Sequence, residues 1–153
     1  MALKIGDRVP EFSLKDQHGK LFSSDSLVGI KPMVIFFYPK DDTPGCTKEA
    51  CSFRDSYEEF KELGAEVIGI SSDSERSHQK FAEKYNLPFI LLSDQNKKVR
   101  KSFKVDKNLF NLLPGRETYV IDKKGKVMMV FNSISASKHM VKALEALKEI
   151  ERI

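Results

Sequence analysis

The sequence of 153 residues has no tryptophan and only two cysteines, Cys46 and Cys51. Two cysteines are too few for the disulfide framework of a small secreted protein. With 41% hydrophobic residues, including 11 phenylalanines, the chain can bury a core without such cross-links. We therefore expect the two cysteines to be present for their chemistry, within a single domain that spans residues 1–153.

An excess of charge of one sign is also missing. The 26 basic and 22 acidic residues leave a net charge of +4, which is scattered along the chain. A balance of this kind favours solubility over nucleic-acid binding, so we expect no nucleic-acid partner. The densest basic cluster, residues 97–101, is interpreted as a solvated helix face.

Long apolar segments and targeting signals are absent as well. The longest apolar run is far shorter than the ~18 residues that span a bilayer, so we expect no membrane association. The amino terminus, MALKIGDRVPEF, lacks a basic region followed by an apolar one. We therefore expect a soluble protein of the cytoplasm.

What is present is a regular alternation of strand and helix patterns. The continuous apolar run at residues 33–38 is typical of a strand buried on both faces. Further strands are expected at residues 65–71, 89–92, 117–122 and 126–132, and an amino-terminal hairpin at residues 11–16 and 21–22. Helices are expected at residues 43–63, 74–85, 96–103 and 137–150, with a loop at residues 104–114. This order predicts an α/β protein with a thioredoxin-like fold, in which helices cover a central mixed sheet.

Residues 39–51, with the sequence PKDDTPGCTKEAC, connect the first buried strand to the first long helix and contain both cysteines. Thr43 is suited to be the N-cap of this helix, and Pro44 to be its first residue. Cys46 would then lie in the first turn. It begins an apolar face whose other members are Ala50, Phe53, Tyr57 and Phe60.

The position of Cys46 favours a reactive thiolate. Unpaired N–H groups and the positive end of the helix dipole stabilise an anion at a helix start. Such a placement can lower the pKa of a thiol from about 8.5 to about 6, which corresponds to about 3.4 kcal/mol. The dipole supplies only ~0.3–2 kcal/mol of this, so a nearby cation is also needed. Thr43 can direct its hydroxyl to the same point. An inert core thiol is the alternative interpretation, because Cys46 begins an apolar face.

Cys51 lies five residues after Cys46. In an ideal helix their Cα atoms would be ~8.6 Å apart, whereas a disulfide requires about 4.4–6.8 Å. The two cysteines could therefore form a disulfide only if the helix unwinds locally. Either they are a redox couple whose two states differ in helix structure, or Cys51 is incidental.

Several motifs resemble those of one family. Pro39, Thr43 and Cys46 form the PxxxTxxC signature of the peroxiredoxins, and Cys51 matches the five-residue offset of their Q-type subfamily (bacterioferritin comigratory protein). The segments GDRVPEFSLKDQHGK, VIGISSDS, FILLSD and RETYVID resemble other parts of the same family. The chain departs from the family pattern in residues 102–114 and at Tyr119, where phenylalanine is more frequent.

This resemblance implies roles for residues of the signature. It makes Cys46 the thiolate that attacks a peroxide, and Cys51 the thiol that resolves the product. Thr43 would bind both the peroxide and the thiolate, and Pro39 would shield the site from water.

The resemblance also implies where the missing cation comes from. Arg116 would supply it beside Cys46, and Glu49 would hold Arg116 in place. Spacing alone favours another interpretation, in which Glu49 is a partner of the helix dipole and Arg116 is a solvated loop charge.

The implied reaction consumes hydrogen peroxide or an organic hydroperoxide. Cys46 would become a sulfenic acid, and Cys51 would condense with it to form an intramolecular disulfide. A thioredoxin-like dithiol donor would then reduce the disulfide, and the subfamily favours a monomer or a weak homodimer. No cofactor or metal is expected, because His18, His78 and His139 lack the spacing of metal ligands and are interpreted as surface or packing residues.

Two other functions are open at this point. A thiol–disulfide oxidoreductase of the thioredoxin type is the alternative enzyme, although its usual CxxC motif has two residues between the cysteines and this chain has four. A redox-switched interaction protein is the alternative outside catalysis, with a partner that binds only the oxidised form. Turnover of a hydroperoxide with a thiol donor would separate both from a peroxidase.

Overall fold

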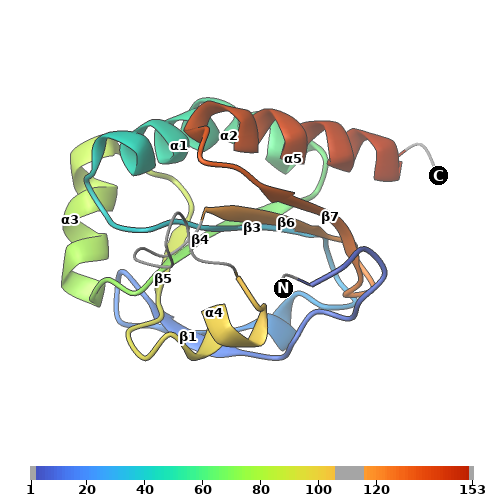
Figure 1. Ribbon diagram of the computed structural model, residues 1–153, viewed down its shortest axis with the longest axis horizontal. Coiled ribbons are helices and arrows are strands. Elements are labelled where there is room, and N and C mark those ends of the chain that lie inside the picture. Colours follow the sequence, from blue (N-terminus) through green and yellow to red (C-terminus); the bar gives the residue numbers. More distant parts are fainter. Residues whose placement is uncertain (1–2, 106–115, 152–153) are drawn as a thin grey trace.

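The computed structural model describes residues 3–105 and 116–151 (Figure 1). Its centre is a seven-stranded sheet with the order β2-β1-β5-β4-β3-β6-β7. The strands are β1 (Ser13–Asp16), β2 (Leu21–Ser23), β3 (Met33–Phe37), β4 (Glu66–Ser71), β5 (Ile90–Ser93), β6 (Glu117–Ile121) and β7 (Val127–Asn132). Strand β4 pairs in parallel with β3 and β5, and the other neighbours are antiparallel. The predicted mixed sheet and amino-terminal hairpin are confirmed.

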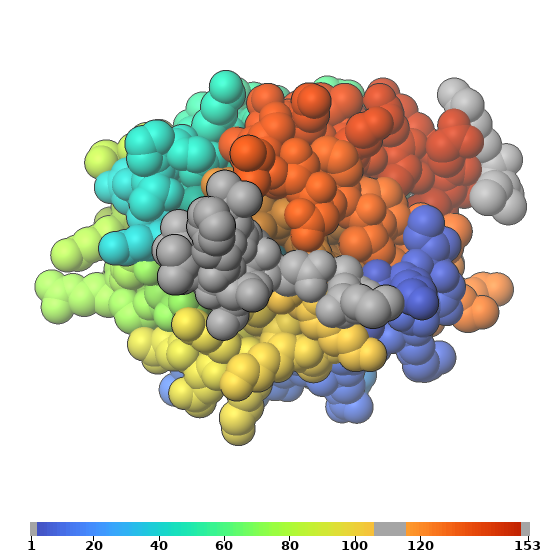
Figure 2. Space-filling view, viewed as in Figure 1, coloured from blue at the N-terminus to red at the C-terminus, as the bar shows by residue number. Residues whose placement is uncertain are grey.

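Helices cover both faces of this sheet, as predicted. They are α1 (Pro44–Asp55), α2 (Tyr57–Glu62), α3 (Glu75–Tyr85), α4 (Lys98–Ser102) and α5 (Ala136–Glu151), with a 3-10 helix, η1 (Ser24–Ser26). Helices α1, α2, α3 and α5 pack into the core on one face, and α4 packs into the core on the other. In the view of Figure 1, α1 and α5 lie above the sheet and α4 lies below it. The space-filling view shows the same separation, with side chains of α1 and α5 at the top and those around α4 at the bottom (Figure 2).

Strand β3 lies between β4 and β6 and is completely buried. Its side chains alternate: Val34 and Phe36 face the core beneath α1, whereas Met33, Ile35 and Phe37 face the core above α4. This confirms the prediction of a strand buried on both faces. Because partners on both sides fix β3, the point where the chain leaves it for α1 is also fixed.

The predicted helix at residues 43–63 is two helices in the structure. Helix α1 ends at Asp55 and α2 begins at Tyr57, and Ser56 between them has φ −108° and ψ 10°. The apolar spacing continues across this break, since the rings of Phe53 and Phe60 lie 5.7 Å apart in one core. The pattern of apolar residues therefore could not locate the break. Gly64, with φ +76°, follows the second helix as predicted.

The basic cluster at residues 97–101 is only partly the solvated face that we predicted. Its three lysines are exposed, but Arg100 is 7% exposed. Arg100 Nη2 donates a hydrogen bond of 3.3 Å to the main-chain oxygen of Tyr38. Helix α4 thus directs a cation toward the carboxyl end of β3, which a run of like charges in the sequence does not reveal.

The other predicted elements differ from the structure by one or two residues at their ends, as element boundaries commonly do. The loop predicted at residues 104–114 falls largely outside the described residues. Within the two described ranges, none of the helices has the length and apolarity that a membrane crossing requires.

Candidate active site

The candidate site is built on the first turn of α1. Thr43 is the N-cap, with extended backbone angles of φ −102° and ψ 156°, and Pro44 is the first helical residue, as the sequence predicts. Cys46 therefore lies in the first turn, where it is 1% exposed, and it is a free thiol. The hydroxyl of Thr43 makes no capping hydrogen bond to the helix, and it donates to the main-chain oxygen of Lys40 at 2.9 Å. Its lone pairs can still accept a hydrogen bond from another donor.

Arg116, directly before β6, reaches this helix start from a distant part of the sequence. Its Nη1 donates to Cys46 Sγ at 3.5 Å and to Glu49 Oε1 at 2.6 Å. The side chain of Arg116 is 12% exposed and that of Glu49 is fully buried. The interpretation from spacing alone, a solvated loop charge at Arg116, is therefore wrong. The structure brings Cys46, Glu49 and Arg116 together around one guanidinium group.

Gly45 makes room for this guanidinium. A Cβ atom at position 45 would lie 2.9 Å from Arg116 Nη2, which is closer than two such atoms can approach. The glycine thus allows the cation to approach the first turn of α1. Sequence reasoning did not single it out, because a glycine between Pro44 and Cys46 carries no local sign of a distant partner.

The carboxyl group of Glu49 lies in an unusual environment. Its Oε2 atom and the Nε atom of Arg116 are buried and have no hydrogen-bond partner among the described residues. Burial raises the pKa of Glu49 to about 8, although the charge of Arg116 and its hydrogen bond act to lower it. A carboxyl group at this position tends to keep its proton near neutral pH. The charge of Arg116 is then less compensated by Glu49 and acts more strongly on Cys46.

His139, on α5, lies behind Glu49. Its Nε2 faces the main-chain oxygen of Ser133 at 2.8 Å, and its Nδ1 faces Thr118 Oγ1 at 2.8 Å. Since a carbonyl oxygen only accepts, Nε2 carries the proton and Nδ1 accepts from the threonine. Burial lowers the pKa of His139 to about 4, so the ring is neutral. Its Nδ1 is 3.6 Å from Glu49 Oε2. His139 is thus a buried packing residue, which is one of the two roles predicted for it, and it also lies next to the site.

Pro39 and Cys51 flank the site along the chain. Pro39 is half-buried in the loop between β3 and α1. Cys51 is half-buried in α1 and is a free thiol like Cys46. Both cysteines lie within one continuous helix, so they cannot form a disulfide in this conformation. The chemistry available in this form is that of a buried thiol beside a cation at a helix start.

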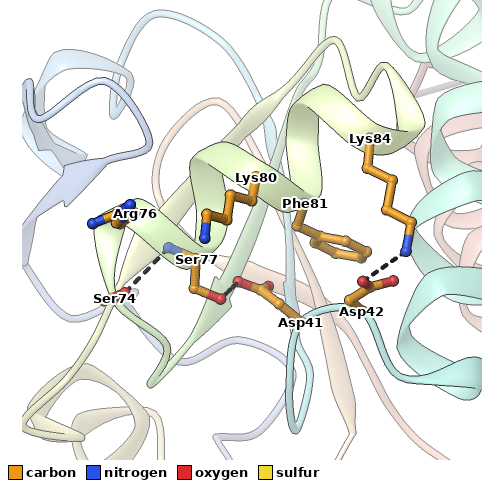
Figure 3. Close-up of a pocket in the computed structure, with 8 residues that line it drawn as sticks. All are labelled: Asp41, Asp42, Ser74, Arg76, Ser77, Lys80, Phe81 and Lys84. Atoms are coloured by element: carbon orange, nitrogen blue, oxygen red, sulfur yellow. Dashed lines mark hydrogen bonds and ion pairs between the residues drawn. The ribbon is translucent and has the colours of Figure 1, made fainter.

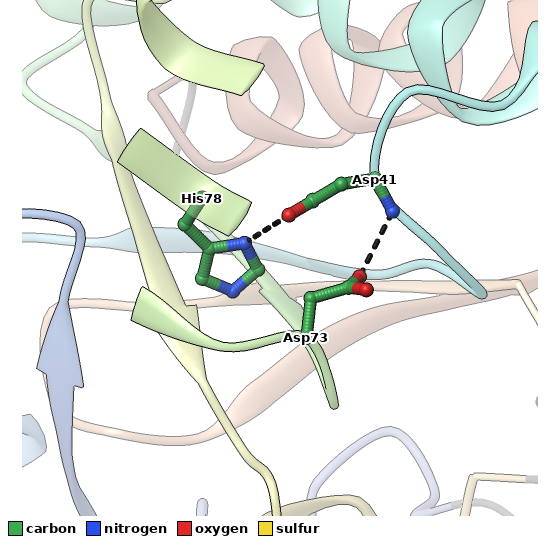
Figure 4. A group of neighbouring side chains, drawn as sticks. All are labelled: Asp41, Asp73 and His78. Atoms are coloured by element: carbon green, nitrogen blue, oxygen red, sulfur yellow. Dashed lines mark hydrogen bonds and ion pairs between the residues drawn. The ribbon is translucent and has the colours of Figure 1, made fainter. Parts of the chain in front are cut away.

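A second group of titratable side chains comes from the loop between β3 and α1, the segment between β4 and α3, and α3 itself (Figure 4). Ligand atoms of Asp41, Asp73 and His78 all lie within 4.8 Å of one another. Spacing in the sequence gave no sign of this cluster, because its members come from three separate segments. His78 is fully buried and makes polar contacts, so it is more than the packing residue that we predicted.

Comparison with known proteins identifies relatives over most of the chain. The model of the AhpC/TSA family matches residues 5–130. The chloroplastic peroxiredoxin Q of Sedum lineare is 54% identical over 147 residues, which cover 95% of this chain and 78% of that protein.

Solved structures give the same result. Peroxidoxin BcpB from Mycobacterium tuberculosis, for which a crystal structure is known, is 44% identical in sequence. The two structures superpose with a TM-score of 0.89 over 97% of this chain and 98% of BcpB. A structure of bacterioferritin comigratory protein from Xanthomonas campestris is 31% identical, with a TM-score of 0.85, over 94% of this chain and 99% of that one. These matches confirm the predicted thioredoxin-like fold.

The comparison corrects one prediction. We expected a cytoplasmic protein, but several close plant relatives are named chloroplastic, which contradicts that expectation. Targeting segments are separate from the folded domain, so the residues that build this sheet and its helices carry no record of compartment.

Proposed function

This chain belongs to the AhpC/TSA family, as a Q-type peroxiredoxin, and from that premise we propose that it reduces hydroperoxides with Cys46 as the attacking thiolate. Thiol-dependent peroxide reduction is what the family does. The roles of the individual residues are our proposal, and so is the view that residues 1–153 act as one thioredoxin-like domain.

In the first step, the sulfur of Cys46 attacks one oxygen of the hydroperoxide. An S–O bond forms and the O–O bond breaks, so that cysteine becomes a sulfenic acid and the peroxide leaves as water or an alcohol after taking up a proton. Arg116 Nη1 lies 3.5 Å from the sulfur, which supports this role. The helix dipole alone stabilises the thiolate too little, and Arg116 supplies the additional positive charge. The same charge stabilises the anion that develops on the leaving oxygen.

Thr43 and Pro39 form the wall of this site on the loop side. The hydroxyl of Thr43 already donates its hydrogen to the main-chain oxygen of Lys40. It therefore acts as an acceptor for the substrate, whose O–H group donates to it. Pro39 has no N–H group to bind water, and its ring limits access of solvent to the thiolate. Glu49 accepts from Arg116 and fixes the direction of the guanidinium.

In the second step, Cys51 attacks the sulfenic acid. An S–S bond forms, and the sulfenic oxygen leaves as water. The first turns of α1 must unwind for this step, because an offset of five residues in a helix keeps the two Cα atoms too far apart for a disulfide. Two observations support an easy opening: no side chain caps the helix start, and Gly45 lies within the first turn.

A dithiol donor of the thioredoxin type then reduces the disulfide and returns α1 to its helical form. The donor is inferred from the family resemblance. Action as a monomer or a weak homodimer is likewise inferred from the family resemblance. The relative from Xanthomonas campestris is described as having alkyl peroxide reduction activity, which supports organic hydroperoxides as substrates here.

The observation that carries this proposal is the approach of Arg116 to Cys46 at the start of α1. Its test is the consumption of hydrogen peroxide and of cumene hydroperoxide by purified protein with a thioredoxin system. Repeated turnover is expected for the wild type and none for Cys46→Ser. Oxidation of one equivalent without turnover would favour a redox switch. Full activity in Cys46→Ser would contradict the proposal.

A further inference from the structure

The loop that carries Pro39 and Thr43 is attached to the rest of the molecule through Asp41. The side chain of Asp41 is 4% exposed and accepts hydrogen bonds on both oxygens. Tyr38 Oη donates to Oδ1 at 2.5 Å. Ser77 Oγ donates to Oδ2 at 2.8 Å, as Figure 3 shows. Burial and the charge of Asp41 raise the pKa of Tyr38, so its hydroxyl keeps the proton that it donates.

His78 provides the third contact to this carboxylate. Its Nδ1 lies 2.7 Å from Asp41 Oδ2, and its Nε2 lies 2.9 Å from the main-chain oxygen of Leu92. The carbonyl oxygen only accepts, so Nε2 donates to it, and Nδ1 is paired with Asp41 Oδ2. The ring is fully buried and is therefore fixed at both ends, by β5 on one side and by the loop on the other.

The backbone of the loop is attached to the same region. The N–H of Asp41 donates to Asp73 Oδ2 at 2.8 Å, and Ser71 Oγ donates to the same oxygen at 2.6 Å. The next residue, Asp42, has φ +55° and accepts from Lys84 and Tyr85 of α3 at 2.9 and 2.8 Å. Figure 3 shows Ser77, Phe81 and Lys84 of α3 turned toward the loop, where a hollow of about 490 Å³ lies between the two.

The side-chain atoms of Asp41, Asp73 and His78 that could bind a metal ion are instead occupied by hydrogen bonds. Asp41 Oδ2 accepts from the hydroxyl of Ser77 and contacts His78 Nδ1, and Asp73 Oδ2 accepts from the N–H of Asp41 and the hydroxyl of Ser71. The contacts described for Asp41 and Asp42 come from Tyr38, directly after β3, from α3, and from Asp73 in the segment between β4 and α3. They do not involve α1, so they persist when that helix opens.

We propose that His78 is a positioning residue for peroxide reduction, which acts through Asp41 to fix the loop that presents Thr43 and Pro39 to the substrate. The inference rests on the proposed function. Thr43 follows Asp41 by two residues, and its main-chain oxygen accepts from the N–H of Thr47 at the start of α1. Displacement of Asp41 would therefore move both the substrate hydroxyl and the helix start. A displacement of about 1 Å in an active site can reduce the rate by about a hundredfold.

Two amides can separate the two ends of the ring. The side-chain nitrogen of His78→Asn replaces Nδ1 and can still donate to Asp41, whereas the contact to Leu92 is lost. The nitrogen of His78→Gln replaces Nε2 and keeps the contact to Leu92, whereas the contact to Asp41 is lost. Each variant loses one buried hydrogen bond, so their losses of stability should be similar. His18→Gln, at an exposed histidine, serves as the matched control.

The test compares kcat/KM for hydrogen peroxide with amide hydrogen exchange at residues 40–43. We expect His78→Gln to lower kcat/KM by about 10- to 100-fold and to speed exchange at these residues. His78→Asn should restore kcat/KM to within about threefold of His18→Gln, with slow exchange. Equal rates for all three variants, or losses that merely follow unfolding temperature, would overturn the proposal.

Two further measurements keep the test decisive. If neither amide variant folds, Ser77→Ala removes a different donor from Asp41 and should produce a smaller loss of rate with faster exchange at residues 40–43. If even the wild type consumes no peroxide, the proposed function fails. The exchange measurement would still show whether His78 fixes the loop. Unchanged exchange in His78→Gln, or in Ser77→Ala where the amide variants do not fold, would overturn that part as well.

Discussion

Arg116 Nη1 lies 3.5 Å from Cys46 Sγ, although the two residues are 70 positions apart in the sequence. The thiol comes from the first turn of α1 and the guanidinium from the residue directly before β6, so the pair exists only because β6 lies beside β3 in the sheet. A thiolate at this point is stabilised by both the helix start and the cation.

Removal of the cation should slow the reaction with peroxide. We expect Arg116→Ala to reduce the rate of sulfenic acid formation by about 10²–10³-fold, because a charged donor to the reacting atoms is lost. Arg116→Lys keeps the charge but not the planar fork, so its rate should be intermediate. Rapid mixing with hydrogen peroxide measures the rate, and Arg76→Ala, at an exposed arginine, is the control. A rate in Arg116→Ala equal to the control would remove this residue from the site.

Gly45→Ala should separate activity from stability. The new Cβ would lie 2.9 Å from Arg116 Nη2, and the flexible end of the arginine can move away at little cost. Alanine is also the better helix former by roughly 0.5–1 kcal/mol, so the free energy of unfolding should change by less than about 1 kcal/mol. The peroxide rate should fall about tenfold, because the guanidinium no longer reaches the sulfur. Urea unfolding and rapid mixing on one preparation test both parts, and an undiminished rate would contradict the geometry.

Glu49 should make folding stability fall as the pH rises above 6.5. Its pKa of about 8 in the folded protein exceeds the ordinary value of 4.5, so the folded state retains a proton that the unfolded state releases. This contribution to stability is present at low pH and is lost as the pH rises through about 8. His139 acts in the opposite direction, but only below its ordinary value of 6.5, since its pKa is lowered to about 4.

Between pH 6.5 and pH 8, Glu49 therefore changes the free energy of unfolding with pH, whereas His139 does not. We expect the free energy of unfolding to decrease by at most about 2 kcal/mol more in the wild type than in Glu49→Gln over this range. Urea unfolding of both proteins at the two pH values gives the difference. Parallel behaviour of the two proteins would show that Glu49 is ionised throughout.

Glu49→Gln should also retain more activity than Glu49→Ala. The amide oxygen of glutamine can accept from Arg116 as Oε1 does, whereas alanine leaves the guanidinium without this partner. We expect a loss of less than about tenfold for Glu49→Gln and a loss several times larger for Glu49→Ala. Equal peroxide rates in the two variants would indicate that Glu49 does not orient the arginine.

The parts of the molecule that the sequence predicts are those specified by neighbouring residues. The apolar run at residues 33–38 specifies a strand without help from distant residues. In the same way, the proline after Thr43 specifies a helix start, and the glycine at position 64 specifies a helix end. Contacts between distant residues were not accessible in this way. Three such features depend on which strands are neighbours. They are the burial of Arg100, the contact between Asp41 and His78 over 37 positions, and the position of His139 behind Glu49. The pairing of Cys46 with Arg116 was suggested by family resemblance, because spacing alone indicated a solvated arginine.

The two cysteines should respond differently to removal. Cys51→Ser should consume one equivalent of peroxide and then stop as a sulfenic acid at Cys46, because no second thiol is available to release water from it. An added small thiol should restore turnover. Trapping of the sulfenic acid with dimedone, followed by mass spectrometry, tests this outcome. Undiminished turnover with the thioredoxin system alone would mean that Cys51 is incidental.

The most direct measurement treats the wild-type protein with one equivalent of hydrogen peroxide and maps its peptides without reduction. We expect a loss of two hydrogen atoms and a bond between Cys46 and Cys51, together with faster amide exchange in the first turns of α1. Conversion of Cys46 to a stable sulfenic acid with no such bond, or a bond formed while α1 stays fully protected, would contradict the proposed opening of α1.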